Sequence, residues 1–236
     1  MTVDAGLRLT QAQMRALNVL RESGRPSEDL SLIAVSKTQS ADAIELLYRQ
    51  GQYDFGENYV QELCAKAAEL GRRGCRKIRW HFIGHLQSNK VKILIPLVTS
   101  IHSVDSEKLA REIAKHCEKL KRQISIFIEV NIDREASKGG LFPEQVSDLA
   151  QTITTLPSLK LEGLMCIPKA TSLFEEKRTS FARLLALEQT LGPLSHRKLS
   201  MGMSDDFEAA VAEGATHLRL GSVIFGARLP KAESAL

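Results

Sequence analysis

The sequence predicts an α/β protein that folds as one closed (β/α)8 barrel of the TIM type, with an extra helix at the N-terminus. Apolar runs with strand character alternate with segments of helical periodicity along the chain. Parallel strands need such helical crossovers, and the 236 residues approach the roughly 250 that this barrel takes. No linker rich in Pro, Gly or Ser divides the chain, so residues 1–236 are expected to form a single domain. An open, doubly wound sheet is the alternative.

The elements follow from the hydrophobic pattern in chain order. Apolar residues spaced between positions 9 and 20 indicate the first helix. The expected strands are 30–36, 52–55, 78–83, 100–104, 124–132, 159–165, 198–201 and 217–220. The segments that complete eight strand–helix pairs include 44–47, 59–70, 88–98, 106–120, 143–156, 172–191 and 206–213. Asp105 or Ser106 is suited to cap the helix that follows it, because a short side-chain oxygen accepts from unpaired amides.

Composition places the chain among ordinary soluble globular proteins. The 32 basic and 28 acidic residues give a net charge of +4, which demands no polyanionic partner, and 43% of the residues are hydrophobic. These values exclude disordered and fibrous proteins. No run approaches the roughly 20 apolar residues that cross a bilayer, and Asp4 and Arg8 interrupt the N-terminal segment. We therefore expect a cytoplasmic protein that contacts no membrane.

The four cysteines argue against a disulfide framework and against a zinc site. Cys64, Cys75, Cys117 and Cys166 are scattered and show no CxxC spacing. Reduced thiols that fill the core are the expected state.

Lys37 is the first candidate functional residue. It follows the apolar run 32–35 and shares a strand face with Ile33 and Val35. In a barrel of this type, chemistry takes place where the strands end. A partly desolvated amine there has a lowered pKa and can form a Schiff base with an aldehyde. The alternative is that Lys37 merely ends the strand and reaches solvent.

Two segments near the C-terminus resemble anion-binding loops. They are 200–206, Ser-Met-Gly-Met-Ser-Asp-Asp, and 219–222, Arg-Leu-Gly-Ser. Small residues let backbone amides approach a ligand, hydroxyls donate to phosphate oxygens, and a helix that begins near Asp206 adds its positive end. The loops after the last two barrel strands often bind phosphate. Turn and capping signals are the alternative interpretation.

Arg219 is expected to point into the barrel mouth together with His217 and Gly221, with the intervening leucines packed outward. A buried guanidinium requires an acceptor. If a pyridine ring lies beside it, the fixed positive charge opposes protonation of the ring nitrogen. The alternative is a structural ion pair with Glu57 or Glu129.

Several motifs together make the sequence similar to the pyridoxal phosphate homeostasis protein family, whose barrel is shared with the N-terminal domain of alanine racemase. The similarity covers nearly the whole chain. The motifs are Ala34-Val35-Ser36-Lys37-Thr38, Phe55-Gly56-Glu57-Asn58-Tyr59-Val60-Gln61-Glu62, Trp80-His81-Phe82-Ile83-Gly84-His85-Leu86-Gln87, Ser137-Lys138-Gly139-Gly140, Gly163-Leu164-Met165, 199–206 and 219–227.

The resemblance implies a barrel of fold-type III that binds pyridoxal 5′-phosphate (PLP). Lys37 would hold the cofactor as a Schiff base, Asn58 would lie near it, and Arg219 would face the ring nitrogen. The phosphate would be surrounded by Ser200, Ser204, Gly221 and Ser222. Members of the family are thought to bind and supply the cofactor without a known turnover.

The chain departs from the family pattern at two places. Gln39 stands where a basic residue is common, and residues 228–231, Arg-Leu-Pro-Lys, replace an aromatic residue and paired lysines. Secondary cofactor contacts at these places are therefore in question. Lys138 follows the strongest predicted strand and is a candidate second amine or phosphate partner.

Two further patterns carry less weight. His81 and His85 have HxxxH spacing, but the residues between them belong to a strand end, so no metal site is expected. Basic residues cluster between 72 and 79 without interleaved aromatic residues, which is typical of a solvated loop and not of a nucleic-acid interface.

The favoured function is a monomeric protein that holds PLP reversibly and supplies it to apo-enzymes that depend on it. The competing function is an amino-acid racemase with weak activity. Racemisation needs a second acid–base group on the opposite face of the substrate, which the related racemases take from an added domain and a partner subunit. Few residues follow position 220, so we expect an open site that exchanges the cofactor and excludes water poorly.

Overall fold

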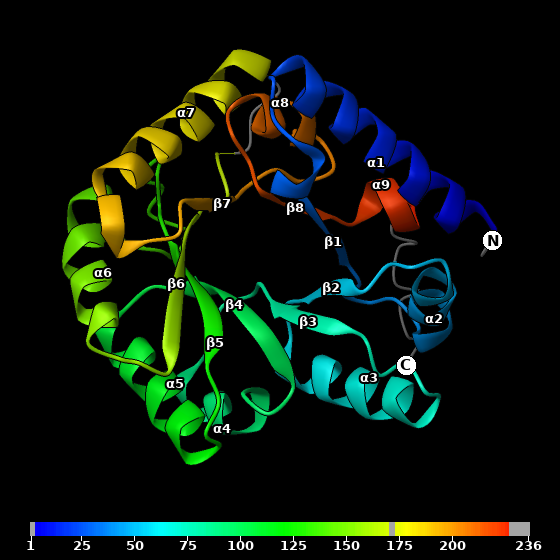
Figure 1. Ribbon diagram of the computed structural model, residues 1–236, viewed down its shortest axis with the longest axis horizontal. Helices are drawn as coiled ribbons and strands as arrows, with labels where there is room; N and C mark the ends of the chain where they lie inside the picture. Colours follow the sequence, from blue (N-terminus) through cyan, green and yellow to red (C-terminus); the bar gives the residue numbers. More distant parts are fainter. Residues whose placement is uncertain (1–2, 170–172, 227–236) are drawn as a thin grey trace, which may run out of the picture.

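The computed structural model describes residues 3–169 and 173–226 of the chain. Eight parallel strands close into a barrel in which β1 pairs with both β2 and β8 (Figure 1). This confirms the predicted (β/α)8 fold and excludes the open sheet. The strands are β1 Ser31–Val35, β2 Asp54–Glu57, β3 Arg79–Phe82, β4 Val98–Val104, β5 Ile124–Glu129, β6 Leu159–Met165, β7 Lys198–Ser200 and β8 His217–Leu220.

Helices surround the barrel (Figure 1). They are α1 Val3–Glu22, α2 Ala41–Arg49, α3 Val60–Arg72, α4 Val91–Leu94, α5 Glu107–Lys119, α6 Val146–Thr154, α7 Phe174–Thr190, α8 Phe207–Ala212 and α9 Ser222–Phe225. Short 3-10 turns are η1 Ser27–Asp29, η2 Ser88–Lys90, η3 Pro143–Gln145 and η4 Gly192–Leu194. Ser106 caps α5 by accepting from the amide of Leu109. No described helix combines the length and the apolar character that a membrane span requires.

The extra N-terminal helix α1 lies along the outside of the barrel beside α8 and α9 (Figure 1). Leu9, Ala12, Ala16 and Leu20 are buried, as the helical period of three to four residues requires. Arg8 donates from Nε to the carbonyl oxygen of Ile224 at 2.8 Å, which ties α1 to the end of the described chain.

Three expected elements differ from the structure. The second strand is shifted from 52–55 to β2, because the side chain of Gln52 donates to the carbonyl oxygen of Leu32 and thereby replaces backbone pairing. The expected strand 124–132 ends at Glu129, where the loop turns on hydrogen bonds of Asn131. The stretch 88–98 holds only η2 and α4, and β4 already begins at Val98.

The inside of the barrel is polar at its centre. The ring of His102 stacks on Phe127 with centroids 4.4 Å apart, and His81 and His217 lie edge-on to it at 5.2 and 6.0 Å. Apolar side chains fill the layer between strands and helices instead, among them Ile44, Leu63, Ile113, Ile153 and Leu184. The main apolar core therefore lies outside the barrel strands, and a column of hydrogen-bonding groups runs inside them.

Candidate functional site

A cavity of about 230 Å³ opens at the carboxyl ends of the strands. The loops that follow β1, β2, β3, β6, β7 and β8 all contribute to its wall. Six of the seven principal predicted site residues line it: Lys37, Asn58, Ser204, Arg219, Gly221 and Ser222. Gln39, one of the departures from the family pattern, also lines the cavity.

The turn that carries Lys37 has an unusual backbone. Ser36 continues the pairing of β1 by donating to the carbonyl oxygen of Gly56 at 2.9 Å. Thr38 then takes a φ of +64°, a left-handed conformation that is unfavourable for a β-branched residue. The amide of Thr38 donates to Oε1 of Glu62 at 2.5 Å. The chain therefore reverses direction at Lys37 and places this residue at the wall of the cavity.

A buried charge cluster supports this turn from below. Nζ of Lys66 donates to the carbonyl oxygen of Ser36 at 2.6 Å and pairs with Glu57 at 2.7 Å and with Glu62 at 2.6 Å. The hydroxyl of Ser36 also donates to Glu57. Burial raises the pKa of Glu57, and the hydrogen bonds from Lys66 and Ser36 oppose this rise. The role of Lys66 was missed from the sequence, although its spacing of four residues from Glu62 on one helix is a usable signal.

Asn58 brings an unsatisfied polar atom to the cavity. Its Oδ1 is buried and has no hydrogen-bond partner in the described part of the chain. Gly84 packs directly against it, since a Cβ at this glycine would lie 2.3 Å from the carbonyl oxygen of Asn58. Ser103 holds the carbonyl oxygen of Gly84 with a 2.6 Å hydrogen bond. A buried acceptor without a donor is costly, so a ligand that donates a hydrogen bond at Asn58 fits this wall.

Arg219 lies at the base of the cavity and is 4% exposed. Its NH1 donates to Oγ of Ser200 at 2.7 Å, and its NH2 donates to the carbonyl oxygen of Cys166 at 2.8 Å. Burial lowers the pKa of the guanidinium, which nevertheless remains protonated at neutral pH. In the described structure neither Glu57 nor Glu129 forms an ion pair with Arg219, so the alternative of a structural ion pair is not observed.

Ser200 takes a different place from the other predicted site residues. It is fully buried and does not belong to the cavity wall. Its hydroxyl lies between NH1 of Arg219 and Nδ1 of His102, at 2.7 Å from each. Ser200 therefore stands behind Arg219, inside the barrel. The sequence predicts a phosphate contact for Ser200 because it begins the 200–206 loop, whereas the structure places its hydroxyl against Arg219 and His102.

The loops after β7 and β8 are joined by one hydroxyl. Oγ of Ser204 accepts from the amides of Gly221 at 3.3 Å and Val223 at 3.2 Å. Both lone pairs of the oxygen are then in use, and the hydroxyl hydrogen remains able to donate. Gly202 makes the turn into this loop possible with a φ of +91°. This part of the wall combines serine hydroxyls with small residues that leave the backbone accessible. Such a wall is suited to an anion.

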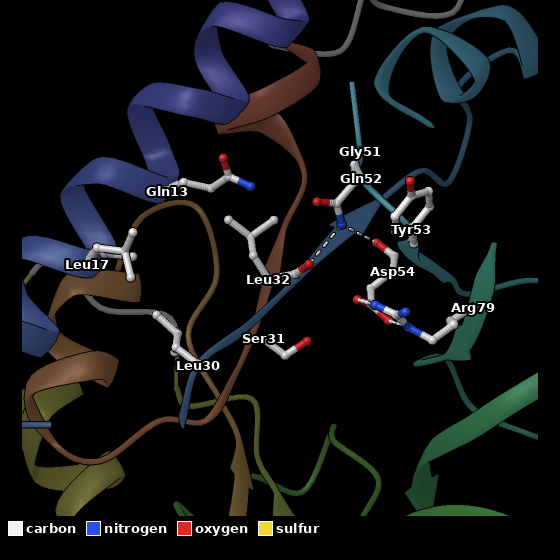
Figure 2. A pocket seen from close by; sticks show the side chains of 11 residues that line it. Gln13, Leu17, Leu30, Ser31, Leu32, Gly51, Gln52, Tyr53, Asp54 and Arg79 are labelled. Carbon is white, nitrogen blue, oxygen red and sulfur yellow. Dashed lines mark hydrogen bonds and ion pairs between the residues drawn. The ribbon is translucent and has the colours of Figure 1, made fainter. Parts of the chain in front are cut away.

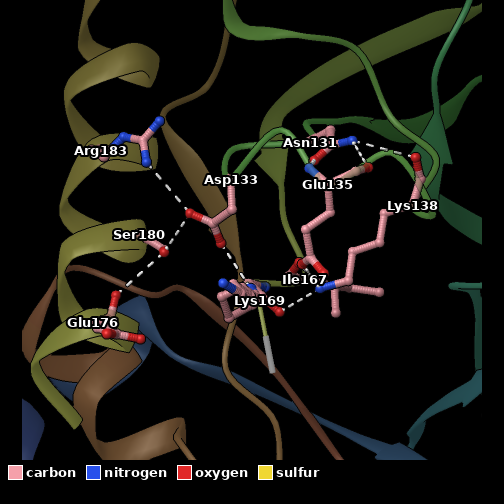
Figure 3. Close-up of polar contacts among 10 residues, drawn as sticks. Asn131, Asp133, Glu135, Lys138, Ile167, Lys169, Glu176, Ser180 and Arg183 are labelled. Atoms are coloured by element: carbon pink, nitrogen blue, oxygen red, sulfur yellow. Dashed lines mark hydrogen bonds and ion pairs between the residues drawn. The ribbon is translucent and has the colours of Figure 1, made fainter. Parts of the chain in front are cut away.

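Lys138 does not belong to the described cavity wall. Its side chain lies beside Glu135 and Ile167 (Figure 3). Its Nζ pairs with Glu135 and donates to the carbonyl oxygen of Pro168 at 2.7 Å. Asp133 reinforces the same region by accepting from the amide of Lys169 and from the hydroxyl of Ser180. Lys138 thus connects the loops after β5 and β6.

The structure also shows where the two histidines of the HxxxH pattern and the basic run between 72 and 79 lie. His81 contacts Asp54 at 3.0 Å inside the barrel, whereas His85 is exposed and lies 3.8 Å from Asp105. The two imidazoles do not converge, and no group of three candidate metal ligands is found among the described residues. In the basic run, Arg73 pairs with Asp42, Glu45 and Glu69. Residues 228–231 lie outside the described residues.

Chemically, the cavity combines a lysine, a buried cation, a buried acceptor and hydroxyl donors. This set of groups fits a small phosphorylated aldehyde with a polar ring. The amine suits a carbonyl group, the guanidinium suits a ring acceptor, and the Ser204 and Ser222 side suits phosphate. The described residues offer no comparable set of ligands for a metal ion.

Comparison with known proteins gives a consistent result. The family model "Alanine racemase, N-terminal domain" matches residues 11–229. The chain is 40% identical to the pyridoxal phosphate homeostasis protein of Pseudomonas aeruginosa, over 93% of this chain and 94% of that protein. It is 36% identical to the protein of the same name from Escherichia coli K12, over 95% of this chain and 97% of that protein.

Solved structures show the same relationship. The structure of PipY from Synechococcus elongatus PCC7942 with PLP bound superposes with a TM-score of 0.82 at 34% identity, covering 94% of this chain and all of that one. Alanine racemase from Corynebacterium glutamicum shares the fold alone, with a TM-score of 0.65 at 16% identity over 94% of this chain and 62% of the racemase. The chain therefore belongs to the pyridoxal phosphate homeostasis protein family, within the wider group that has the alanine racemase N-terminal barrel.

Proposed function

We propose that this protein binds PLP reversibly at the cavity and contributes to its homeostasis in the cytoplasm. The observation that carries the proposal is the convergence of Lys37, Asn58, Arg219 and Ser204 on one cavity at the strand ends. The homeostasis proteins to which the chain is 36–40% identical and the PLP-bound PipY structure support the identity of the ligand.

Each residue has a separate task in this proposal. Lys37 forms the Schiff base with the aldehyde of the cofactor. Ser204, Gly221 and Ser222 hold the phosphate, and Asn58 accepts a hydrogen bond from the ligand. Arg219 lies against the ring nitrogen, where its fixed charge disfavours protonation of the ring. Condensation of the Lys37 amine with the aldehyde would release water, and hydrolysis of the resulting imine would free the cofactor again.

We infer that the monomeric protein delivers the cofactor to apo-enzymes and has no turnover of its own. Apart from Lys37, the described cavity wall holds no histidine, cysteine or tyrosine that could serve as a second acid–base group, and its one carboxylate is that of Asp205. A racemase requires such a group on the far face of the substrate. Sustained turnover of alanine that is proportional to protein and lost in Lys37→Ala would favour the racemase function instead.

An absorbance spectrum combined with reduction tests the binding proposal. Protein mixed with PLP should absorb near the violet edge, and borohydride should remove this absorbance and fix a pyridoxyl group on the peptide that contains Lys37. Lys37→Ala should lose the stable absorbance, whereas Lys138→Ala should keep it. Mass mapping that finds the label on Lys138 alone would contradict the assignment.

A transfer experiment tests delivery. The loaded protein should restore the activity of a PLP-dependent apo-enzyme while its own violet absorbance falls. A trap for free aldehyde shows whether the cofactor passes through solution. If the absorbance persists for hours while the acceptor stays inactive, simple delivery is wrong.

A further inference from the structure

A chain of hydrogen bonds crosses the interior of the barrel and ends at Arg219. Oδ1 of Asp54 lies 3.0 Å from Nε2 of His81, and Nδ1 of His81 lies 3.0 Å from Nε2 of His102. Nδ1 of His102 lies 2.7 Å from Oγ of Ser200, which accepts from Arg219 at 2.7 Å. The chain thus passes from β2 through β3, β4 and β7 to β8.

The two ends of this chain lie in different cavities. Arg219 belongs to the cavity at the carboxyl ends of the strands. Asp54 belongs to a cavity of about 370 Å³ between α1 and the start of β1, where Nε and NH2 of Arg79 donate to its two carboxylate oxygens (Figure 2). The interior of the barrel therefore connects the proposed cofactor site with the opposite end of the molecule.

Only one arrangement of hydrogens gives every donor in the chain an acceptor. Asp54 is ionised: burial alone would raise its pKa, but hydrogen bonds from Arg79 and His81 outweigh burial and lower it. Nε2 of His81 must then carry the hydrogen, and its bare Nδ1 must accept from Nε2–H of His102. The bare Nδ1 of His102 accepts from the hydroxyl of Ser200.

The opposite arrangement is disfavoured by an unpaired hydrogen. If His81 were a cation, it would donate to His102, which would donate in turn to Ser200. Ser200 also accepts from Arg219, so its own hydrogen would have no acceptor among the described contacts. Burial is the main cause that lowers the pKa of His102, and the charge of Arg219 acts in the same direction. Burial also lowers the pKa of His217 to about 3, so both imidazoles are neutral at physiological pH.

We propose that Asp54, His81 and His102 are positioning residues for the cofactor pocket. Acting through Ser200, they fix the guanidinium of Arg219 in one orientation and leave its charge free to act on the ligand. All hydrogen bonds of the chain point from Arg219 towards Asp54. No described carboxylate forms a hydrogen bond with Arg219 at the pocket, and the charges of Glu129 and Asp206 reach it only from a distance. The proposal rests on the proposed function for the identity of the ligand, but the order of the hydrogens is a property of the cofactor-free protein.

Nuclear magnetic resonance of the cofactor-free protein with 15N-labelled histidine tests this order directly. Two-bond correlations distinguish the imidazole nitrogen that carries hydrogen. His81 and His102 should both be neutral Nε2–H tautomers, with the signals assigned through His102→Phe and Ser200→Ala. In Ser200→Ala the Nδ1 of His102 loses its donor, so its resonance should shift while that of His116 stays. A doubly protonated or Nδ1–H form of His102 in the wild-type protein would overturn the proposal.

Ligand binding then tests the action on Arg219. His102→Phe keeps the stacked ring against Phe127 but breaks the chain, and Ser200→Ala breaks it by removing one oxygen. Each should weaken PLP by about tenfold and leave the 1-deaza analogue of PLP, which has CH in place of the ring nitrogen, nearly unaffected. His116→Phe is the matched control, because His116 pairs with Glu112 on the outer helix α5.

The outcomes separate this proposal from the proposed function. Equal weakening of PLP and the analogue would mean that the chain acts only on stability, and would overturn the positioning role. If His102→Phe does not fold, the affinities of Ser200→Ala for PLP and for the analogue decide between the two interpretations. If the wild-type protein binds neither ligand, the proposed function fails, and the tautomers of the cofactor-free protein still decide whether the chain has the proposed order.

Discussion

Two buried cations lie on opposite sides of the cavity. Lys66, beneath the turn that carries Lys37, pairs with the carboxylates of Glu57 and Glu62. Arg219 instead donates to two neutral acceptors, the hydroxyl of Ser200 and the carbonyl oxygen of Cys166. Both cations are at least nine-tenths buried. The charge of Lys66 is neutralised by adjacent carboxylates. Arg219 is connected to a carboxylate, that of Asp54, only through the neutral groups Ser200, His102 and His81.

This difference indicates two uses of a buried charge. Ionised partners fix the position of Lys66. Lys66 then donates to the carbonyl oxygen of Ser36, and its partner Glu62 accepts from the amide of Thr38, so the cluster holds the backbone of the turn. The neutral partners of Arg219 accept one hydrogen bond each from NH1 and NH2 and do not cancel the charge of the guanidinium. The Lys37 side is therefore suited to hold a reactive group in position, and the Arg219 side is suited to act electrostatically on a bound ring.

Lys66→Met should have the largest effect on stability. It leaves Glu57 buried without its counter-charge, and the free energy of unfolding should fall by about 3–5 kcal/mol in urea denaturation. Because burial already raises the pKa of Glu57, protonation relieves the penalty, so the loss should be larger at pH 8 than at pH 5. Lys115→Met, which breaks the exposed pair with Glu112, should cost less than about 1 kcal/mol. Equal losses of unfolding free energy in Lys66→Met and Lys115→Met would contradict a structural role for the buried Lys66 cluster.

Ser204→Ala probes the other side of the cavity. Loss of a hydroxyl that donates to a charged phosphate should weaken PLP by about 1.5–3 kcal/mol, measured by equilibrium dialysis. Pyridoxal, which has no phosphate, should lose much less. Ser106→Ala is a suitable control, because it removes the cap of α5 without touching the cavity and should leave the ratio of the two affinities unchanged. Equal losses for both ligands in Ser204→Ala would argue against a phosphate contact.

The sequence was sufficient to predict the barrel and most of the cavity wall, because both depend on local patterns. The alternation of strand and helix fixes the order of the elements, and the residues that follow the strands meet at one end. The pattern therefore predicts that Lys37, Arg219 and the Ser204 loop lie together, and all three line the same cavity.

The supports of the cavity could not be predicted in the same way, because they depend on contacts across the barrel. His102 and Ser200 are 98 positions apart and meet only when β4 and β7 face each other inside the closed sheet. The pairing of Lys66 with Glu57 depends on how α3 packs on β2. The shift of β2 has a similar origin, since the side chain of Gln52 reaches Leu32 on the neighbouring strand.

Gly84→Ala should disturb the wall between these two sides. The new Cβ would lie 2.3 Å from the carbonyl oxygen and 2.7 Å from Cα of Asn58, so backbone must move. We expect a loss of about 1–3 kcal/mol in the free energy of unfolding, together with weaker PLP binding. Gly71→Ala on α3 meets nothing within 4 Å and should gain up to about 1 kcal/mol. Unchanged PLP binding in a destabilised Gly84→Ala would contradict a role for Asn58 in the cavity.

The smallest effect is expected for Asp54, at the end of the barrel opposite the cofactor cavity, where the free energy of unfolding should depend on pH. Arg79 and His81 lower the pKa of Asp54 despite its burial. A carboxyl group whose pKa is lower in the folded protein contributes stability above its unfolded pKa of about 4 and loses that contribution as the pH falls below it. Asp54→Asn removes this contribution. The difference in unfolding free energy between wild type and variant should therefore be greatest from pH 5 to 7 and shrink towards pH 2, whereas Glu107→Gln in an exposed pair of α5 should give a nearly flat difference. A gap between wild type and Asp54→Asn that widens on acidification would mean that Asp54 is protonated in the folded protein, and the order of hydrogens inferred for the barrel interior would then be wrong.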